Sequence, residues 1–203
     1  MLEIKTKDIR EYVFRVLQKN SSEELTCEEL SKITFLNLNQ MNFKREWNEY
    51  DFSDMAYFTN LESCTLNGFV VDEKMIVNLN QLPHLKGLVF NHCQFSTNHM
   101  ITSPLDRLVL NWTSINDMNN FKESCGLKRL KIIHAKEVVD AMIFKPFEVI
   151  EELDICDSEI QNVSALDELK TLHSLCLDGS KLDNEYQRND ISFSHEEEFF
   201  LIG

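Results

Sequence analysis

Glycine is scarce in this sequence, with five residues in a chain of 203. Loops that cradle phosphate groups rely on glycine, because their backbone must approach the ligand closely. The sequence also contains no GxGxxG, P-loop, HExxH or GxSxG motif. These absences argue against the common nucleotide-dependent, metalloprotease and hydrolase sites, so we predict no catalytic residues and no cofactor.

Long hydrophobic runs are missing as well. No stretch of about 18 uncharged apolar residues occurs, and the N-terminal stretch MLEIKTKDIREYVFRVL is interrupted by charges. Neither a membrane span nor a signal peptide is therefore indicated. We expect a soluble, cytoplasmic protein that does not bind membranes.

Closely spaced cysteine pairs are absent, although the chain contains six cysteines and 43% apolar residues. No CxxC motif occurs, and several cysteines stand where an apolar residue would serve equally well. We therefore expect reduced, buried thiols rather than disulfides or metal ligands. The six are Cys27, Cys64, Cys93, Cys125, Cys156 and Cys176.

Basic residues are outnumbered, with 20 Lys and Arg against 34 Asp and Glu, giving a formal net charge of -14. Nucleic acids and anionic membranes carry the same sign of charge, so both are disfavoured as partners. A basic protein partner is permitted by this charge.

One short pattern recurs along most of the chain. The stretch 172–182 reads LHSLCLDGSKL, with leucine at places one, four, six and eleven. This spacing fits neither the period of two of a strand nor the period of about 3.6 of a helix. Seven copies fit the sequence, and successive starts differ by 28, 24, 20, 22, 23 and 22 residues. The copies begin at Ile33, Leu61, Leu85, Leu105, Leu127, Ile150 and Leu172.

The order LxxLxLxxxxL resembles the leucine-rich repeat family, in its short class of about 22 residues, over roughly residues 27–182. The resemblance implies an α/β solenoid in which each unit gives one short strand, so that a curved parallel sheet forms the concave face. Places four and six would then point into the interior, as alternate residues of a strand do. The family prefers asparagine at place nine, which satisfies backbone groups of neighbouring turns. Here Ser, Thr or Cys can do part of that work, whereas Met41, Phe69 and Ala135 cannot, so we expect a less regular ladder.

Charges support the same alignment. The second place of successive units reads Glu62, Lys86, Asp106, Lys128, Glu151 and His173. Opposite charges on neighbouring strands are favourable, so this alternation is expected of a correct register. The alignment also predicts that Arg129 lies beside Glu152, Lys131 beside Asp154, and Lys136 beside Glu159.

We divide the chain into three parts. Residues 1–32 are predicted to form an N-terminal helical cap, with a helix over residues 7–19 that Thr6 N-caps. Its apolar face is expected to contain Ile9, Val13, Val16 and Leu17. A second helix begins with the capping box Thr26 to Glu29. Residues 33–182 contain the repeats. Residues 183–203 form either an acidic C-terminal cap or a tail that a partner captures.

The first interval between repeats is long and aromatic. Residues 43–58 either pack as a bulky convex loop or provide a second interface, and the sequence leaves both interpretations open. Further along, Val163, Leu166 and Leu169 predict one or two helical turns on the outer face.

The candidate binding residues lie on the concave face and its rim. At place eight, Trp112 stands between His92 and His134, an arrangement that suits an anchor in a protein interface. At place seven, Asn91 and Asn111 belong to a row of amides. The alternatives are local packing for Trp112 and a structural ladder for the amides. The charged candidates are Arg107, Arg129 and Lys131. His92 and His134 are two units apart, roughly 10 Å, so we predict no metal site.

We interpret the sequence as a non-catalytic module that binds a protein partner through the concave face and its rim. The alternative is an inhibitor or immunity-type protein that neutralises a basic partner. An enzyme or an enzyme-associated subunit is less favoured. The repeat pattern specifies neither the partner nor the oligomeric state.

Overall fold

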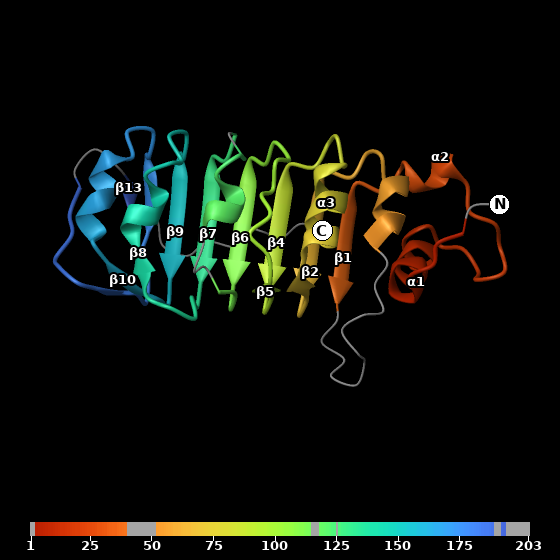
Figure 1. The fold of residues 1–203 in the computed structure, drawn as a ribbon, viewed down its shortest axis with the longest axis horizontal. Helices are drawn as coiled ribbons and strands as arrows, with labels where there is room; N and C mark the ends of the chain where they lie inside the picture. The colour runs from red at the N-terminus through yellow and green to blue at the C-terminus, as the bar shows by residue number, and fades with distance from the viewer. Residues whose placement is uncertain (1–2, 40–51, 115–117, 125, 189–191, 194–203) are drawn as a thin grey trace.

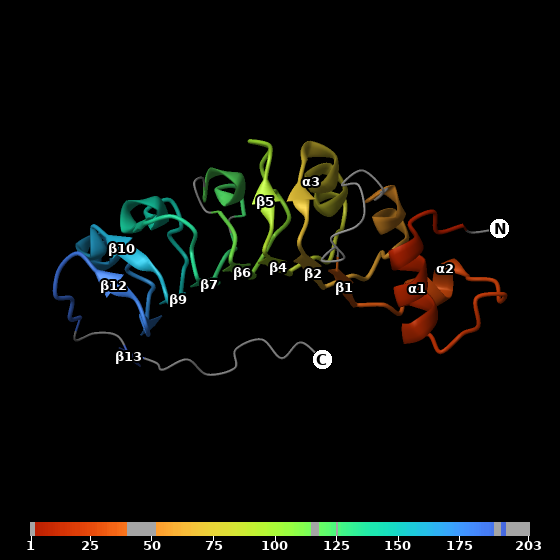
Figure 2. The ribbon, with the colours of Figure 1, turned by 90° about the horizontal axis from the view of Figure 1, so that it is seen from below.

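The structure, a computed structural model, describes residues 3–39, 52–114, 118–124, 126–188 and 192–193. Its main element is an eight-stranded sheet in which every neighbouring pair of strands is parallel. Figure 1 shows these strands side by side along the long axis, and Figure 2 shows that the sheet is curved. In spatial order the strands are β1 (Phe35–Asn39), β2 (Ser63–Asn67), β4 (Gly87–Asn91), β6 (Arg107–Asn111), β7 (Arg129–Ile133), β9 (Glu152–Cys156), β11 (Ser174–Cys176) and β13 (Ser192–Phe193).

The register follows the repeat. Leu88 pairs with Leu108, and Leu108 pairs with Leu130, so that each place of one unit lies beside the same place of the next. Side chains at places four and six of these strands point into the core and are at most 2% exposed, as at Leu130 and Ile132. The predicted fold, a curved leucine-rich repeat solenoid with an inward-pointing leucine pattern, is therefore confirmed.

Short helices line the convex side of the sheet (Figure 2). They are η1 (Phe52–Tyr57), α3 (Glu73–Asn80), η2 (Met118–Phe121), η3 (Ala141–Phe144) and η4 (Val163–Glu168). The helical turn predicted near residue 163 is η4, and Val163, Leu166 and Leu169 are buried as expected. In the long first interval, Phe52 packs edge-on against Phe69 at 5.7 Å between ring centroids. Residues 43–51 of the predicted aromatic loop lie outside the described residues.

Two small parallel sheets connect these return segments. One pairs β3 (Val70–Val71) with β5 (Gln94–Phe95), and the other contains β8 (Val139–Asp140), β10 (Glu159–Gln161) and β12 (Lys181–Leu182). Here the prediction that Lys136 lies beside Glu159 is wrong. Ile160 pairs with Val139, so Glu159 falls opposite Val138, and its carboxylate instead contacts Lys181 Nζ at 3.2 Å. From Ile133 to Val139 the chain advances six residues, whereas between their register partners Cys156 and Ile160 it advances four, and this difference of two shifts the register.

The other predicted charge neighbours are confirmed by the register of the main sheet. Arg129 lies opposite Glu152, and Lys131 lies opposite Asp154 with an Nζ to Oδ2 distance of 3.8 Å. In the second-place column, Lys128 Nζ contacts Glu151 Oε1 at 2.7 Å.

The N-terminal helices α1 (Lys7–Val16) and α2 (Cys27–Leu30) cover the start of the sheet. Ile9 and Val13 are fully buried, whereas Val16 is 45% exposed, so its predicted place on the buried face is wrong. The helix ends at Val16, which removes that residue from the packed stripe. Thr6 is the N-cap by position, but its backbone N–H donates to Asp54 Oδ2 at 2.7 Å, which links the cap to the first interval.

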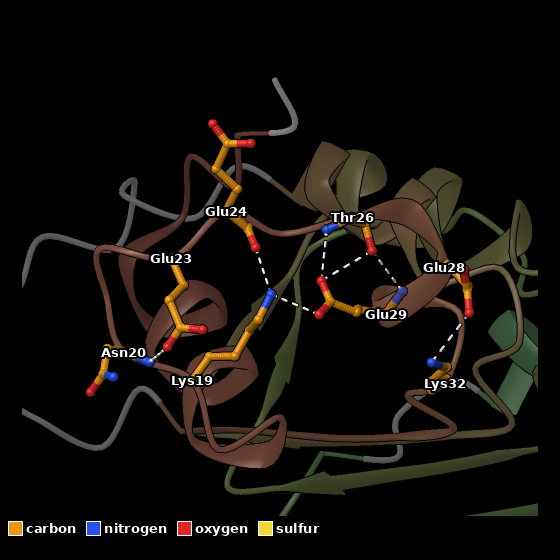
Figure 3. A network of polar contacts seen from close by, with 8 residues as sticks. All are labelled: Lys19, Asn20, Glu23, Glu24, Thr26, Glu28, Glu29 and Lys32. Atoms are coloured by element: carbon orange, nitrogen blue, oxygen red, sulfur yellow. Dashed lines mark hydrogen bonds and ion pairs between the residues drawn. The ribbon is translucent and has the colours of Figure 1, made fainter.

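The predicted capping box at α2 is confirmed (Figure 3). The Glu29 N–H donates to Thr26 Oγ1 at 3.2 Å, and the Thr26 N–H donates to Glu29 Oε2 at 3.0 Å. Lys19 Nζ lies 2.7 Å from Glu29 Oε1 and also donates to the Glu24 carbonyl. The Lys19 ammonium and these Thr26 bonds lower the pKa of Glu29 to about 2, so its carboxylate stays charged and fastens the loop before α2 to the end of α1.

The described part of the C-terminal region packs on the last repeat. The carboxylate of Asp183 accepts from the N–H of Asn162 at 2.6 Å, and the Arg188 guanidinium donates to the carbonyls of Leu166 and Leu169. The Ser192 N–H donates to the His173 carbonyl at 2.9 Å, where β13 joins the sheet beside β11. Figure 2 shows the chain directly after β12 at the end of the solenoid.

The described cysteines carry free thiols. Cys64, Cys93, Cys156 and Cys176 are buried, and Cys27 is exposed. Cys125 lies outside the described residues. Within the described ranges, no helix is both long and apolar enough to cross a membrane.

Candidate functional site

The concave side of the main sheet presents three rows of side chains, because places three, five and seven of each unit point away from the core. The third-place row contains Phe35, Ser63, Gly87, Arg107, Arg129, Glu152 and Ser174. The fifth-place row contains Asn37, Thr65, Val89, Val109, Lys131, Asp154 and Cys176. The seventh-place row contains Asn39, Asn67, Asn91, Asn111, Ile133, Cys156 and Asp178. All eight predicted binding residues belong to these rows or to the rim beside them, and one of them, Lys131, is buried beside Asp154.

Place eight follows the strand in a left-handed backbone conformation. Six successive units share positive φ angles at this place, at Gly68 (77°), His92 (52°), Trp112 (49°), His134 (49°), Asp157 (48°) and Gly179 (67°). Each of the first five donates its N–H to the place-seven carbonyl of the next strand, as Trp112 does to Ile133 at 3.0 Å. This turn ends the strand and directs the place-eight side chain to the rim. Sequence reasoning missed the conformation, although two glycines and an aspartate at one place signalled it.

Trp112 forms the centre of an aromatic stack at this rim. Its ring lies parallel to His92 with 5.9 Å between centroids, and 4.5 Å from the tilted ring of His134. Trp112 nevertheless keeps 45% of its surface exposed. His134 Nδ1 lies 3.8 Å from Asp157 Oδ2, so the carboxylate of the next repeat lies at the end of the stack. The rim therefore offers a rigid aromatic surface that needs little side-chain ordering on binding.

The amide row is partly a ladder, as one interpretation predicted. Asn91 Nδ2 donates to Asn67 Oδ1 at 2.7 Å, and Asn67 Nδ2 donates to Asn37 Oδ1 at 2.9 Å. The next amide breaks the series, because Asn111 Oδ1 is buried with no hydrogen-bond partner within the described ranges. Asn91 is therefore occupied by structure, and Asn111, beside Trp112, has an acceptor in need of a donor.

Place nine follows place eight in the sequence. Hydroxyl side chains at this place form hydrogen bonds with backbone groups of the preceding unit. Thr113 Oγ1 accepts from the Cys93 N–H at 3.3 Å and donates to the Phe90 carbonyl at 3.0 Å. Ser158 Oγ likewise accepts from the Ala135 N–H of the preceding unit at 3.1 Å, but it donates to the Cys156 carbonyl of its own unit at 2.8 Å. The hydroxyls thus do the work that the family's asparagine does, and they hold the rim in place.

The basic candidates divide into two kinds. Lys131 is 6% exposed and faces Asp154, so it forms part of a buried ion pair. Arg107 and Arg129 are half-buried and lie directly opposite each other in the register of β6 and β7. Arg107 Nε contacts Asp106 Oδ1 at 3.1 Å, and in the part of the chain that the structure describes the Arg129 guanidinium has no hydrogen bond or ion pair.

The buried thiols are poor nucleophiles. Burial raises the pKa of Cys64 to about 12 and that of Cys93 to about 11, so both are protonated at neutral pH. Burial also raises the pKa of Cys156 and Cys176, whose sulfur atoms lie 3.6 Å apart. These groups suit packing rather than covalent catalysis.

Comparisons with known proteins identify the fold alone. No family model matches the chain, and no curated protein matches it. Among solved structures, internalin C2 from Listeria monocytogenes is 16% identical, with a TM-score of 0.58 over 94% of this chain and 93% of that one. An internalin (inlF) from the same organism is 21% identical, with a TM-score of 0.58 over 89% of this chain and 58% of its own.

Two larger proteins are also similar. Mouse RP105, in its complex with MD-1, is 18% identical with a TM-score of 0.56, and this chain covers 29% of it. TLR13, in its complex with the RNA ssRNA13, is 23% identical with a TM-score of 0.55, and this chain covers 23% of it. All four are leucine-rich repeat proteins, so the chain has the leucine-rich repeat fold.

Proposed function

We propose that this protein is a non-catalytic module that binds a protein partner through the concave face and the rim at Trp112. The observation that carries the proposal is the exposed stack of His92, Trp112 and His134, held by left-handed turns at the ends of three adjacent strands. A tryptophan that is already ordered by its neighbours loses little conformational entropy when a partner covers it. The structurally similar mouse RP105 occurs in a complex with MD-1, which supports protein binding as a use of this fold.

A protein partner is favoured over a nucleic acid by charge. The chain carries a net charge of -14, and only Arg107 and Arg129 provide accessible cationic groups on the concave rows. A nucleic-acid surface would need several more phosphate contacts to reach useful affinity at physiological salt.

The test is affinity capture from the native cell with Trp112→Ala and Arg129→Glu variants of the full chain. We expect each variant to capture at least tenfold less partner than the wild-type chain does, as quantified by mass spectrometry. Met142→Ala is the matched control, because Met142 is 44% exposed on the convex side and its loss should leave capture unchanged. Undiminished capture by Trp112→Ala and Arg129→Glu would contradict the proposal.

An inhibitor that neutralises a basic partner is the second candidate function, favoured by the net charge of -14. Its partner should bind with a steep salt dependence, since the attraction would be mainly electrostatic. Capture that falls at least tenfold between 50 and 300 mM salt, roughly, would favour this candidate.

A further inference from the structure

A cavity lies beside the rim, at the edge where three adjacent units turn from the main sheet to the convex side. Its volume is about 620 Å³, which is within the range of pockets that hold a ligand. One wall follows β5, and the opposite wall contains Lys136 and Glu137, just before β8. The cavity therefore lies between the two small sheets of the convex side.

This cavity adjoins the aromatic stack on which the proposed function depends. Residues at place ten of three units line the cavity, two positions after the place-eight residues of the stack. Trp112 and Ser114 are one such pair, and two residues span at most about 7 Å. In Figure 2 this edge of the solenoid, where the strands end, faces the viewer. A partner that covers Trp112 therefore has the cavity within reach of a neighbouring side chain.

A carboxylate stands in the cavity where other units have an apolar side chain. Place eleven is occupied by Val71, Phe95 and Ile160 in three other units, but by Glu137 in the fifth. Ser114 Oγ donates to Glu137 Oε1 at 2.8 Å, which orients the carboxylate. A polar group at an apolar place costs stability, and such departures from a local rule are expected at binding sites.

Apolar side chains line the same cavity. Phe95 and Phe121 meet edge to face with 5.6 Å between ring centroids, and Leu110 reaches the cavity from β6. A carboxylate beside apolar groups suits a side chain with an aliphatic stem and a cationic head. Arginine suits it better than lysine, because the planar guanidinium can donate two parallel hydrogen bonds to one carboxylate.

We propose that this cavity receives an arginine side chain of the protein partner, with the guanidinium on Glu137 and an adjacent partner residue on Trp112. The inference deepens the proposed function and rests on it. The net charge of -14 attracts a basic partner from solution. Lys136 also lines the cavity, but it is exposed, whereas Glu137 is half-buried. A charge acts more strongly where water is partly excluded, so the carboxylate determines the preference.

The test uses the full chain and a fluorescein-labelled tetra-arginine peptide, with binding measured by fluorescence anisotropy in roughly 150 mM salt. We expect Glu137→Gln to weaken binding at least tenfold. Glutamine keeps an oxygen that can accept from Ser114, so the local hydrogen bond is retained. Glu159→Gln is the matched control, because it removes the same charge from an exposed side chain that contacts Lys181 at 3.2 Å. This control should leave binding unchanged.

The indole N–H of Trp112 gives a second measurement. In nitrogen–proton correlation spectra, tetra-arginine should shift this signal in the wild-type chain and leave it in place in Glu137→Gln. The Trp112→Phe variant, which lacks the signal, identifies it. A signal that does not move in the wild-type chain would overturn the shared placement of arginine and rim contact.

Three further outcomes would overturn the proposal. Equal losses in Glu137→Gln and Glu159→Gln would mean that the peptide responds only to net charge. Tighter binding of a tetra-glutamate peptide, lost in Lys136→Gln, would assign the cavity to an acidic segment. Free arginine that binds as tightly as the peptide would assign it to a small molecule.

The failure of this inference is distinguishable from the failure of the proposed function. If tetra-arginine binds through Glu137 but Trp112→Ala leaves partner capture undiminished, the proposed function fails and the cation site stands. If capture depends on Trp112 and is unchanged in Glu137→Gln, the rim is the binding site and the arginine cavity is refuted.

Discussion

At the scale of single residues, burial has made the thiols of Cys64 and Cys93 poor nucleophiles. Cys64 and Cys93 have side chains with no exposed surface, and burial raises their pKa to about 12 and about 11. A thiol in the unfolded chain titrates near pH 8.5. The neutral thiol is therefore the form that the fold accommodates, and the thiolate is the form that it excludes.

This difference predicts a pH dependence of stability with a definite sign. A group whose pKa is raised by folding stabilises the fold fully below its unfolded pKa, and that contribution is lost as the pH rises towards the folded value. The free energy of unfolding should therefore decline from about pH 8.5 upward. Urea unfolding of the wild type and Cys64→Val between pH 7 and pH 10 would measure it, and the variant should show the shallower decline. Parallel curves for the two chains would contradict the assignment.

The same burial was predictable from the sequence, but the conformation at the rim was not predicted. Cys64 stands at the apolar place four and Cys93 at place nine, which also points to the interior, so their burial followed from the register. The left-handed turn at His92, Trp112 and His134 was missed, because a histidine or tryptophan at one place carries no glycine-like signal by itself. The signal lay in the column, where Gly68 and Gly179 occupy the same place.

At the scale of elements, hydroxyls at place nine of three units, those of Thr113, Ser158 and Ser180, bond to backbone groups of the preceding unit. Thr113 is 1% exposed, and its hydroxyl serves the Cys93 N–H as acceptor and the Phe90 carbonyl as donor. Thr113→Val keeps the shape but leaves both backbone groups without that partner, which should cost about 1–3 kcal/mol of unfolding free energy. Thr113→Ser, which keeps the hydroxyl, should lose much less. Chemical denaturation of the two variants measures the difference, and equal losses would show that the methyl group matters instead.

Element pairing was predictable on one side of the solenoid and not on the other. Leucines at places four and six fix the register of the main sheet, because a shift by one residue would turn the apolar set outward. The return segments have no such repeated constraint. Two extra residues after β7 therefore moved Glu159 away from Lys136 and beside Lys181. The amide ladder also leaves the seventh-place row, because Asn67 donates to Asn37 at place five. This bond depends on the rotamer of Asn67, which the spacing of the repeat does not determine.

At the scale of the whole molecule, one buried ion pair lies in the middle of the concave face. Lys131 on β7 and Asp154 on β9 have side chains that are 8% and 11% exposed, with Nζ and Oδ2 3.8 Å apart. Charges removed from water in this way interact strongly, but each has lost its hydration. The pair therefore adds less net stability than its contact suggests, while each partner alone would be costly.

A double-mutant cycle on this pair makes the last prediction. Lys131→Met removes the ammonium that lies 3.8 Å from the Asp154 carboxylate, and Asp154→Leu removes that carboxylate from beside the Lys131 ammonium. Each single substitution should lower the unfolding free energy by about 3–5 kcal/mol, whereas the double substitution should lie within about 1–2 kcal/mol of the wild type. Urea unfolding of the four chains gives the cycle. Additive losses in the double variant would mean that each charge is satisfied by other groups, and the face would then be held by separate contacts rather than by this pair.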